Sequence, residues 1–364
     1  MDEGAVMGAG KVFVGAALAQ WLNEHAATLD SEPGAGAQLL PRLASEGLFG
    51  LGVATEFGGR AGSDIGHAIE AIAELASHSL TAAFVAWAQR VVIETVARGA
   101  NKPLADACLP DLLAGRLAGA SGLSNAIKSL SGIDSLRIHA SETPRGWKLN
   151  GRIDWITNAR PEGFLATAAT SLPDGSMAIV ALRSETEGLV RHPDLPLLGL
   201  RASSTCALDL NNLVLTPAGL IHLDARQVLP GLRPVLVGLQ CGLAIGLARA
   251  SLRAAEPGQA AVLGQARQHL AGNLQALSAE LVQGVRQARF IQQPARLFAL
   301  RIALAELAQQ AAELELQAAG GKAWLQSDTN GFARRWREAA FLPVVTPSLV
   351  QLKTELARLA AQSA

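Results

Sequence analysis

Apolar residues in the first third of the chain recur at spacings of three and four. One such stripe consists of Ile65, Ile69, Ile72 and Leu75. This spacing places the four side chains on one face of a helix, and Ser63-Asp64 just before them is a typical N-cap. We therefore expect residues 1–118 to form an N-terminal helical domain.

Between residues 119 and 222 the pattern changes to an alternation of apolar and polar residues. The alternating segments are Ser135 to Ser141, Phe164 to Thr170, Ser176 to Leu182 and Cys206 to Leu215. A period of two indicates strands with one buried face. Asn150-Gly151 between two apolar runs is the usual signature of a two-residue hairpin turn. We expect a small antiparallel sheet or barrel, with a hairpin that turns at Asn150-Gly151.

From Asp224 onward the helical period returns. Its stripes are Leu270, Leu274, Leu277 and Leu281, and then Leu304, Leu307, Ala311 and Leu314. Gly242 and Gly246 are four residues apart, so a second helix can approach them closely. Helices with such stripes pack as bundles, and we predict a C-terminal helical bundle over residues 223–364.

Charge and length exclude several classes of protein. The chain has 31 basic and 31 acidic residues and 49% hydrophobic residues, so it lacks the positive charge typical of nucleic-acid binding. The longest apolar run, residues 234–248, is shorter than the roughly 20 residues of a membrane span. We expect no membrane span and no nucleic-acid partner.

The cysteines and the first residues bear on the compartment. Cys108, Cys206 and Cys241 stand far apart, without the spacing of a disulfide framework or a metal site. Residues 1–4 are Met-Asp-Glu-Gly, which lack the positive start of a secretory signal. We therefore expect a cytoplasmic protein with reduced, buried thiols and no metal.

The candidate chemistry lies in residues 146–159. After the expected turn, Ile153, Trp155 and Thr157 share one face of a strand. A planar indole beside a hydroxyl is suited to hold a flat cofactor, although a tryptophan in a strand also packs in cores. The pattern leaves both readings open. The glycines of residues 47–62 suit a phosphate cradle or, as we prefer, tight turns.

Five landmarks, in order along the chain, resemble the acyl-CoA dehydrogenase superfamily. They are the glycine-rich residues 47–59, residues 149–159, Gly199 to Thr205, Gln317 to Gly321, and the arginine-rich residues 334–338. The resemblance implies an α+β fold with an N-terminal helical domain, a middle antiparallel β-domain and a C-terminal four-helix bundle. It also implies a homodimer or homotetramer with FAD between domains and subunits.

The same resemblance assigns site residues. Trp155 would pack against the isoalloxazine, and the Thr157 hydroxyl would reach its N5 edge. Leu123 and Ser124 fall where a strand of the family contacts the pyrimidine edge of the flavin. Three further residues match the segment that meets the dinucleotide of a neighbouring subunit, with a helix C-cap as the alternative: Gln317, Gly320 and Gly321.

Two departures from the family change the expected chemistry. The family's arginine clamp for the FAD diphosphate is absent from residues 254–259, so weak FAD binding, FMN in its place, or no flavin are all open. The family's catalytic glutamate is also absent, both at Val344 to Ser348 and at the less common position, Val235 to Gly238. Glu338 fits an ion-pair partner better than a base, and the sequence does not say where Glu355 points. The catalytic residue is therefore unassigned.

Three hypotheses follow. The first is a flavin-dependent oxidoreductase of the acyl-CoA dehydrogenase type, acting on a small molecule such as an acyl-CoA thioester, with an electron-transfer partner. The second is a flavin-dependent monooxygenase or oxidase on the same scaffold, and the monooxygenase would take reduced flavin from a reductase. The third is a catalytically degenerate binding or assembly subunit. We place the oxidoreductase first.

Overall fold

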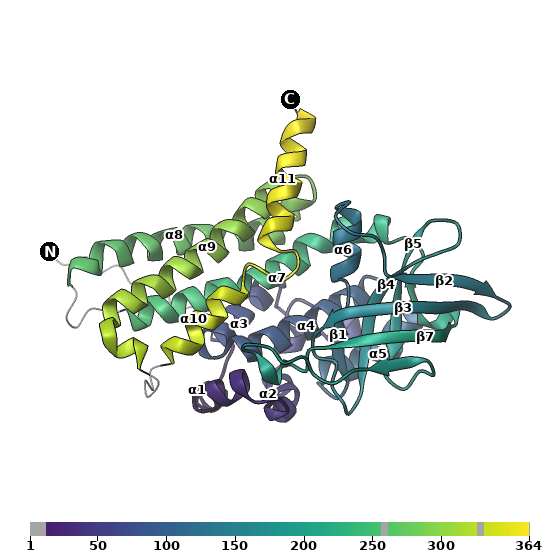
Figure 1. The fold of residues 1–364 in the computed structure, drawn as a ribbon, viewed down its shortest axis with the longest axis horizontal. Coiled ribbons are helices and arrows are strands. Elements are labelled where there is room, and N and C mark those ends of the chain that lie inside the picture. The colour runs from purple at the N-terminus through teal and green to yellow at the C-terminus, as the bar shows by residue number, and fades with distance from the viewer. Residues whose placement is uncertain (1–11, 256–260, 326–330, 364) are drawn as a thin grey trace.

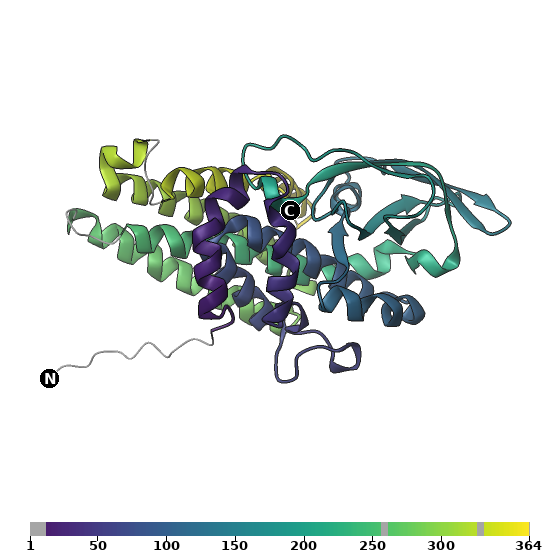
Figure 2. The same ribbon diagram turned by 90° about the horizontal axis from the view of Figure 1, so that it is seen from below.

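The computed structural model describes residues 12–255, 261–325 and 331–363. Two segments used in the sequence analysis lie outside these described residues. One is residues 1–4, and the other is residues 256–259, which form most of the segment compared with the family's arginine clamp. The N-terminal helices are α1 (Ala16–Ser31), α2 (Leu39–Ser45), α3 (Ile65–His78), α4 (Leu80–Ala97) and α5 (Lys102–Leu113). Figure 2 shows α1 and α2 crossing the molecule near its middle.

The predicted cap of α3 is confirmed. The Asp64 side chain accepts from the His67 backbone N–H at 3.1 Å, and His67 Nδ1 accepts from the Asp64 N–H at 3.0 Å. This reciprocal pair satisfies two backbone donors that a helix start leaves free. The glycine-rich connection before α3 consists of turns, with positive φ at Gly52 (71°) and Gly58 (88°), which fits the preferred turn interpretation.

The middle of the chain forms one sheet of eight strands. They are β1 (Ala118–Ser121), β2 (Ile138–Thr143), β3 (Gly146–Ile156), β4 (Phe164–Ser171), β5 (Met177–Arg183), β6 (Leu189–Arg191), β7 (Cys206–Leu215) and β8 (Leu220–His222). The order is β6-β7-β3-β2-β4-β5-β8, and β1 pairs with β4. Most pairs are antiparallel, but β4 pairs in parallel with both β1 and β2. The sheet is therefore mostly antiparallel, as predicted, with the two parallel pairs at β4 as an addition to the predicted pattern.

The expected hairpin turn at Asn150-Gly151 is also wrong, because β3 runs straight through these residues. The turn between β2 and β3 lies at Pro144-Arg145 instead. Gly151 has a φ of 148°, and the register of β3 against β7 shifts at this point. A Cβ on Gly151 would lie 2.1 Å from the Arg137 carbonyl oxygen. A β-bulge and a hairpin turn demand the same glycine freedom, so the sequence signal fits both.

The C-terminal helices are α7 (Ala225–Ala254), α8 (Gly264–Arg286), α9 (Pro294–Ala319), α10 (Phe332–Phe341) and α11 (Leu349–Ser363). In Figure 1 α7, α8 and α9 run side by side on one side of the molecule, with the sheet on the other. This is the predicted helical, sheet, helical order.

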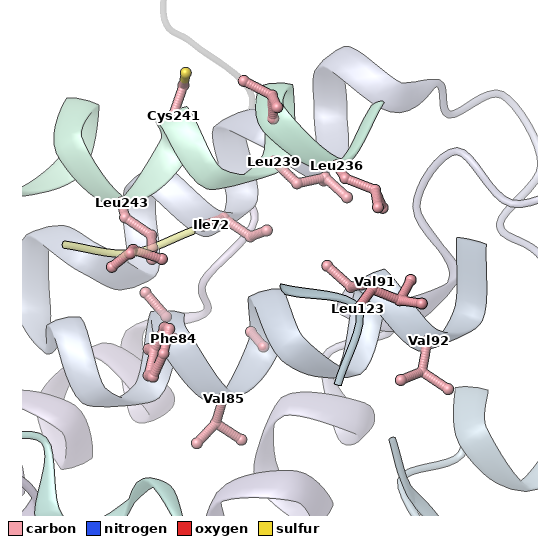
Figure 3. Packing of buried hydrophobic residues seen from close by; sticks show 14 of the residues in the cluster. Ile72, Phe84, Val85, Val91, Val92, Leu123, Leu236, Leu239, Cys241 and Leu243 are labelled. Atoms are coloured by element: carbon pink, nitrogen blue, oxygen red, sulfur yellow. The ribbon is translucent and has the colours of Figure 1, made fainter. Parts of the chain in front are cut away.

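The helices α4 and α7 form the apolar centre. Both are long and apolar enough to cross a membrane, yet 89% of each apolar window is buried inside the protein. The prediction that residues 234–248 form a buried helix is thus confirmed. The helix α3 packs directly on α7, where a Cβ on Gly246 would lie 1.9 Å from the Ala73 carbonyl oxygen. Figure 3 shows the apolar side chains that meet between these helices.

Candidate functional site

A cavity of about 380 Å³ lies where α4, α7, the sheet and the loop after α10 meet. We call it the Trp155 cavity. Its walls are mostly apolar, and four of the seven predicted cofactor residues line it, namely Leu123, Ser124, Trp155 and Thr157. Figure 3 shows three of the lining residues, with Val91 of α4 next to Leu123 and with Leu236 on α7 facing them. The volume lies within the roughly 300–1,000 Å³ that small-molecule sites occupy.

Trp155 and Thr157 stand at the end of β3 but differ in exposure. The Trp155 side chain is 59% exposed, so it presents an indole face rather than filling the core, whereas Thr157 is 7% exposed. The Thr157 and Thr205 hydroxyl oxygens lie 3.1 Å apart, which fixes the Thr157 hydroxyl within the wall. Ile153 lines a neighbouring hollow with Trp155 rather than this cavity, because the pairing of β3 with β7 is irregular after Ile153.

Leu123 and Ser124 line the cavity from a helix rather than from a strand. The strand β1 ends at Ser121, and Leu123 is the N-cap residue of a short helix, α6 (Ser124–Leu130). The expected position on a strand was therefore wrong, although both residues still reach the cavity.

Three aromatic side chains that the sequence patterns did not single out complete the apolar wall. Phe84 and Trp87 of α4 stack with ring centres 5.5 Å apart, and Phe341 of α10 meets the Phe84 ring edge-on at 5.1 Å. The Trp87 indole N–H donates to the Leu236 carbonyl at 3.3 Å. Because α4 is apolar almost all round, its pattern marks no face as special.

The loop after α10 is held in place by a buried arginine. Arg301 is 1% exposed, and it donates to the Gln240 side chain at 3.0 Å and to the Leu342 carbonyl at 2.7 Å. Gln240 in turn donates to the Thr346 carbonyl at 2.9 Å. Burial lowers the pKa of the Arg301 guanidinium. These bonds satisfy loop carbonyls that burial would otherwise leave unpaired.

Both segments that the family resemblance set against the catalytic glutamate contribute residues to this wall. The loop after α10 contributes Val344, Val345, Thr346 and Pro347, and α7 contributes Leu236 and Val237. No aspartate, glutamate or histidine is among the described residues that line the cavity. The cavity therefore has hydroxyls and two cations, Lys128 and Arg233, but no side chain suited to remove a proton at neutral pH.

The two carboxylates that the sequence raised as possible bases are occupied elsewhere. Glu338 is fully buried, pairs with Arg334 at 2.7 Å and accepts from the Leu80 N–H at 3.2 Å. Burial raises the pKa of Glu338 despite the Arg334 charge. Glu355 does not line the cavity, and it accepts from Ser131 at 2.5 Å and from Arg233 at 3.1 Å. Each binds within the protein, as predicted for Glu338.

The remaining three predicted residues lie apart from the cavity. Gln317 is near the end of α9, Gly320 is its C-cap with a φ of 62°, and all three of Gln317, Gly320 and Gly321 are exposed. Within one chain they fit the C-cap alternative. Their predicted role requires a neighbouring subunit.

The described residues provide neither a cluster of metal ligands nor a reactive cysteine for the site. No group of three or more histidine, cysteine, aspartate or glutamate side chains there is arranged to hold a metal ion. All three cysteines are free and buried. Burial raises the pKa of Cys206 to about 11 and that of Cys241 to about 12, so both stay protonated and inert at neutral pH.

Comparisons with known proteins agree with this architecture. Residues 13–116 match the family described as acyl-CoA dehydrogenase, N-terminal domain. No curated protein sequence matches the chain.

Solved structures match the chain over nearly its whole length. Glutaryl-coenzyme A dehydrogenase in its glutaryl-CoA complex is 19% identical with a TM-score of 0.82, over 95% of this chain and 93% of that one. Dibenzothiophene monooxygenase (TdsC) from Paenibacillus sp. A11-2 is 19% identical with a TM-score of 0.75, over 96% of each chain. KijD3, in complex with FMN and a dTDP-linked sugar, is 20% identical with a TM-score of 0.77, over 96% and 92%.

At these identities the solved structures establish the fold, whereas the N-terminal match is one of sequence. The fold is shared by a dehydrogenase and a monooxygenase, so it does not select between those reactions. The chain thus matches the acyl-CoA dehydrogenase N-terminal family over residues 13–116, and it shares its three-part fold with solved acyl-CoA dehydrogenases.

Proposed function

We propose that the chain is a flavin-dependent oxidoreductase whose flavin ring lies in the Trp155 cavity. The observation that carries the proposal is the pairing of an exposed indole, Trp155, with a fixed hydroxyl, Thr157, in one apolar cavity. These residues fit a flat, mostly apolar ring with polar edges. When bound, a flavin supplies a two-electron acceptor, and the protein supplies its position and surroundings.

Each wall residue has a distinct task in this proposal. The Trp155 indole would cover one face of the ring and keep water from it. The Thr157 hydroxyl, held by Thr205, offers a hydrogen bond at a fixed position, and a preorganised dipole stabilises charge better than mobile water does. Leu123 and Ser124 at the start of α6 provide one apolar and one polar contact beside them.

The identity of the flavin is a finer proposal. The family resemblance favours FAD, whereas the missing arginine clamp at residues 254–259 favours FMN, which has no adenosine diphosphate portion to hold. One structurally similar protein, KijD3, is in complex with FMN. The exposed residues Gln317, Gly320 and Gly321 would contact the FAD of a neighbouring subunit, and this requires a homodimer or homotetramer. Binding of FAD through these residues and assembly into an oligomer are therefore predicted together. We further propose a cytoplasmic protein.

The reaction is constrained by what lines the cavity. Dehydrogenation of an acyl-CoA thioester requires a carboxylate within hydrogen-bond reach of the substrate α-carbon. Both family positions for that group present apolar side chains or Thr346 here. This favours the monooxygenase of the second candidate, which takes its electrons from a reductase, because adding oxygen to a substrate does not require a carboxylate that removes an α-proton.

The visible spectrum of the purified protein, with mass identification of any released flavin, tests the shared part of both candidates. A protein that stays colourless after addition of FAD or FMN contradicts both, and leaves the degenerate binding or assembly subunit. If flavin is bound, anaerobic mixing with acyl-CoA thioesters of several chain lengths separates the two. Bleaching supports dehydrogenation; turnover that needs oxygen and a reductase, without bleaching, supports the second.

A further inference from the structure

We propose that this protein binds a small amphiphilic acid beside the flavin ring, with its apolar body against Ile127 and Leu236 of the Trp155 cavity and its carboxylate in an adjoining basic hollow. That hollow, which we call the arginine annex, has a volume of about 250 Å³ and is lined by Arg226, Arg233, Arg358 and Glu355. The proposal deepens the proposed function and rests on it, since the acid would be the substrate presented to the flavin.

The two hollows are neighbours because they share part of their lining. Ile127 of α6 and Arg233 and Leu236 of α7 border both. The shared wall is apolar apart from Arg233, whose guanidinium therefore stands between the apolar cavity and the annex. A ligand that spans the two hollows would contact apolar side chains in the Trp155 cavity and cations in the annex. An amphiphilic acid matches this arrangement, because it has an apolar body and a carboxylate at one end.

The charges around these hollows are strongly unbalanced. Lys128 lines the Trp155 cavity, and Arg226, Arg233 and Arg358 line the annex, against the single carboxylate of Glu355. No side-chain ion pair forms between Lys128, Arg226 or Arg358 and any acidic residue in the described ranges. Three cations thus remain available to an anion, and clustered cations focus potential in a low-dielectric hollow.

Arg233 is oriented for this task. One nitrogen, Nη1, donates to Glu355 Oε2 at 3.1 Å, and the guanidinium lies 4.9 Å from the centre of the Phe298 ring. Glu355 is 5% exposed and is itself held by the Ser131 hydroxyl at 2.5 Å. The other N–H groups of Arg233 donate to no described residue. A guanidinium has five N–H donors in a planar fork, so it can bind a second carboxylate.

The test measures binding of octanoate and of neutral octanamide to the full-length protein by calorimetry at one fixed ionic strength, because salt screens such contacts. We expect octanoate to bind at least about tenfold more tightly than octanamide, as charge-assisted hydrogen bonds predict. Equal affinities would overturn the proposal. So would tight binding of octanoyl-CoA together with no binding of octanoate, which would make the thioester the ligand.

Substitution of single arginines tests whether the annex binds the carboxylate of octanoate. Arg226→Gln and Arg358→Gln remove exposed cations, and each should weaken octanoate binding about two- to fivefold without changing octanamide binding. Arg145→Gln, an exposed arginine in the β2–β3 turn, is the matched control and should change neither. Unchanged octanoate affinity in both annex variants would overturn the proposal.

Arg233 needs a compensated variant, because Arg233→Gln alone leaves Glu355 buried without its cation. The pair Arg233→Gln with Glu355→Gln keeps a neutral hydrogen-bonding partner on each side and should weaken octanoate binding about tenfold or more. Flavin binding is measured separately by absorbance. Selective octanoate binding without a flavin spectrum contradicts the proposed function alone, whereas a flavin spectrum without octanoate selectivity contradicts this inference alone.

Discussion

Replacement of Thr157 by valine separates the role of its hydroxyl from the role of its bulk. The valine keeps the shape of the side chain and removes one hydrogen bond, the 3.1 Å contact with the Thr205 hydroxyl. Thr205 retains a second partner, the Ser203 hydroxyl at 2.8 Å, so no buried polar atom is left alone. The expected loss in the free energy of unfolding is the net value of one hydrogen bond, about 0.5–1.5 kcal/mol.

The effect on flavin binding has its own magnitude. If the Thr157 hydroxyl also contacts the flavin, its loss should weaken flavin binding by about 1 kcal/mol, or roughly fivefold in Kd. Thr157→Ser is the control: it keeps the hydroxyl and loses a buried methyl, so it lowers stability by a similar amount, about 1 kcal/mol, but leaves flavin affinity unchanged. Fluorescence titration with FMN and FAD, beside urea unfolding, measures both quantities. Equal flavin affinity in wild type and Thr157→Val would refute the assigned role.

Three further predictions concern the scaffold. Gly246→Ala should lower the free energy of unfolding by about 1–3 kcal/mol, because its Cβ would lie 1.9 Å from a facing carbonyl oxygen of α3. Gly272→Ala in α8, where a Cβ would meet nothing within 4 Å, should instead raise the free energy of unfolding by about 0.5–1 kcal/mol. Denaturant midpoints measure the direction of both changes. Burial raises the pKa of Cys241 to about 12, so the native protein should resist thiol reagents at pH 8 and react only when unfolded; rapid native labelling of Cys241 would contradict its burial. The His192 hydrogen bond, together with Arg152, lowers the pKa of Asp209 below its usual value. A carboxyl whose pKa is lowered in the folded protein stabilises the fold at pH values above its unfolded pKa, and it loses that contribution as the pH falls through its folded pKa. Wild type should therefore lose more stability below about pH 4 than Asp209→Asn does. Parallel acid-unfolding curves for the two proteins would contradict this prediction.

Elements with a strong local signal could be predicted from the sequence. The stripe in α3 and its Asp64 cap follow from helical spacing and from the orphan donors of a helix start. Gly242 and Gly246 predicted the close approach that α3 makes. Trp155 and Thr157 line one cavity because they stand two residues apart at the end of a strand. Each of these predictions depends on residues close together in the chain.

Features that depend on distant residues could not be predicted in this way. The parallel pairing of β1 with β4 joins segments far apart in sequence, and nothing in either segment marks its partner. Lys128 and Arg233 meet at one cavity only because the short helix α6 packs near α7. The buried Arg301 holds the loop after α10, although an arginine in a helical pattern ordinarily indicates an exposed face. Asn150-Gly151 misled because a bulge and a turn both favour a glycine at positive φ.

The measurement that tests the central claim most directly is a titration of the purified protein with FMN and FAD, followed by visible absorbance, for wild type and Trp155→Ala. Trp155 is 59% exposed, so its removal should leave the fold intact. If the flavin ring lies against this indole, wild type should shift and sharpen the flavin bands, and Trp155→Ala should bind about tenfold more weakly. A flavin spectrum that stays that of free flavin in wild type, or equal affinity in both proteins, would contradict the account.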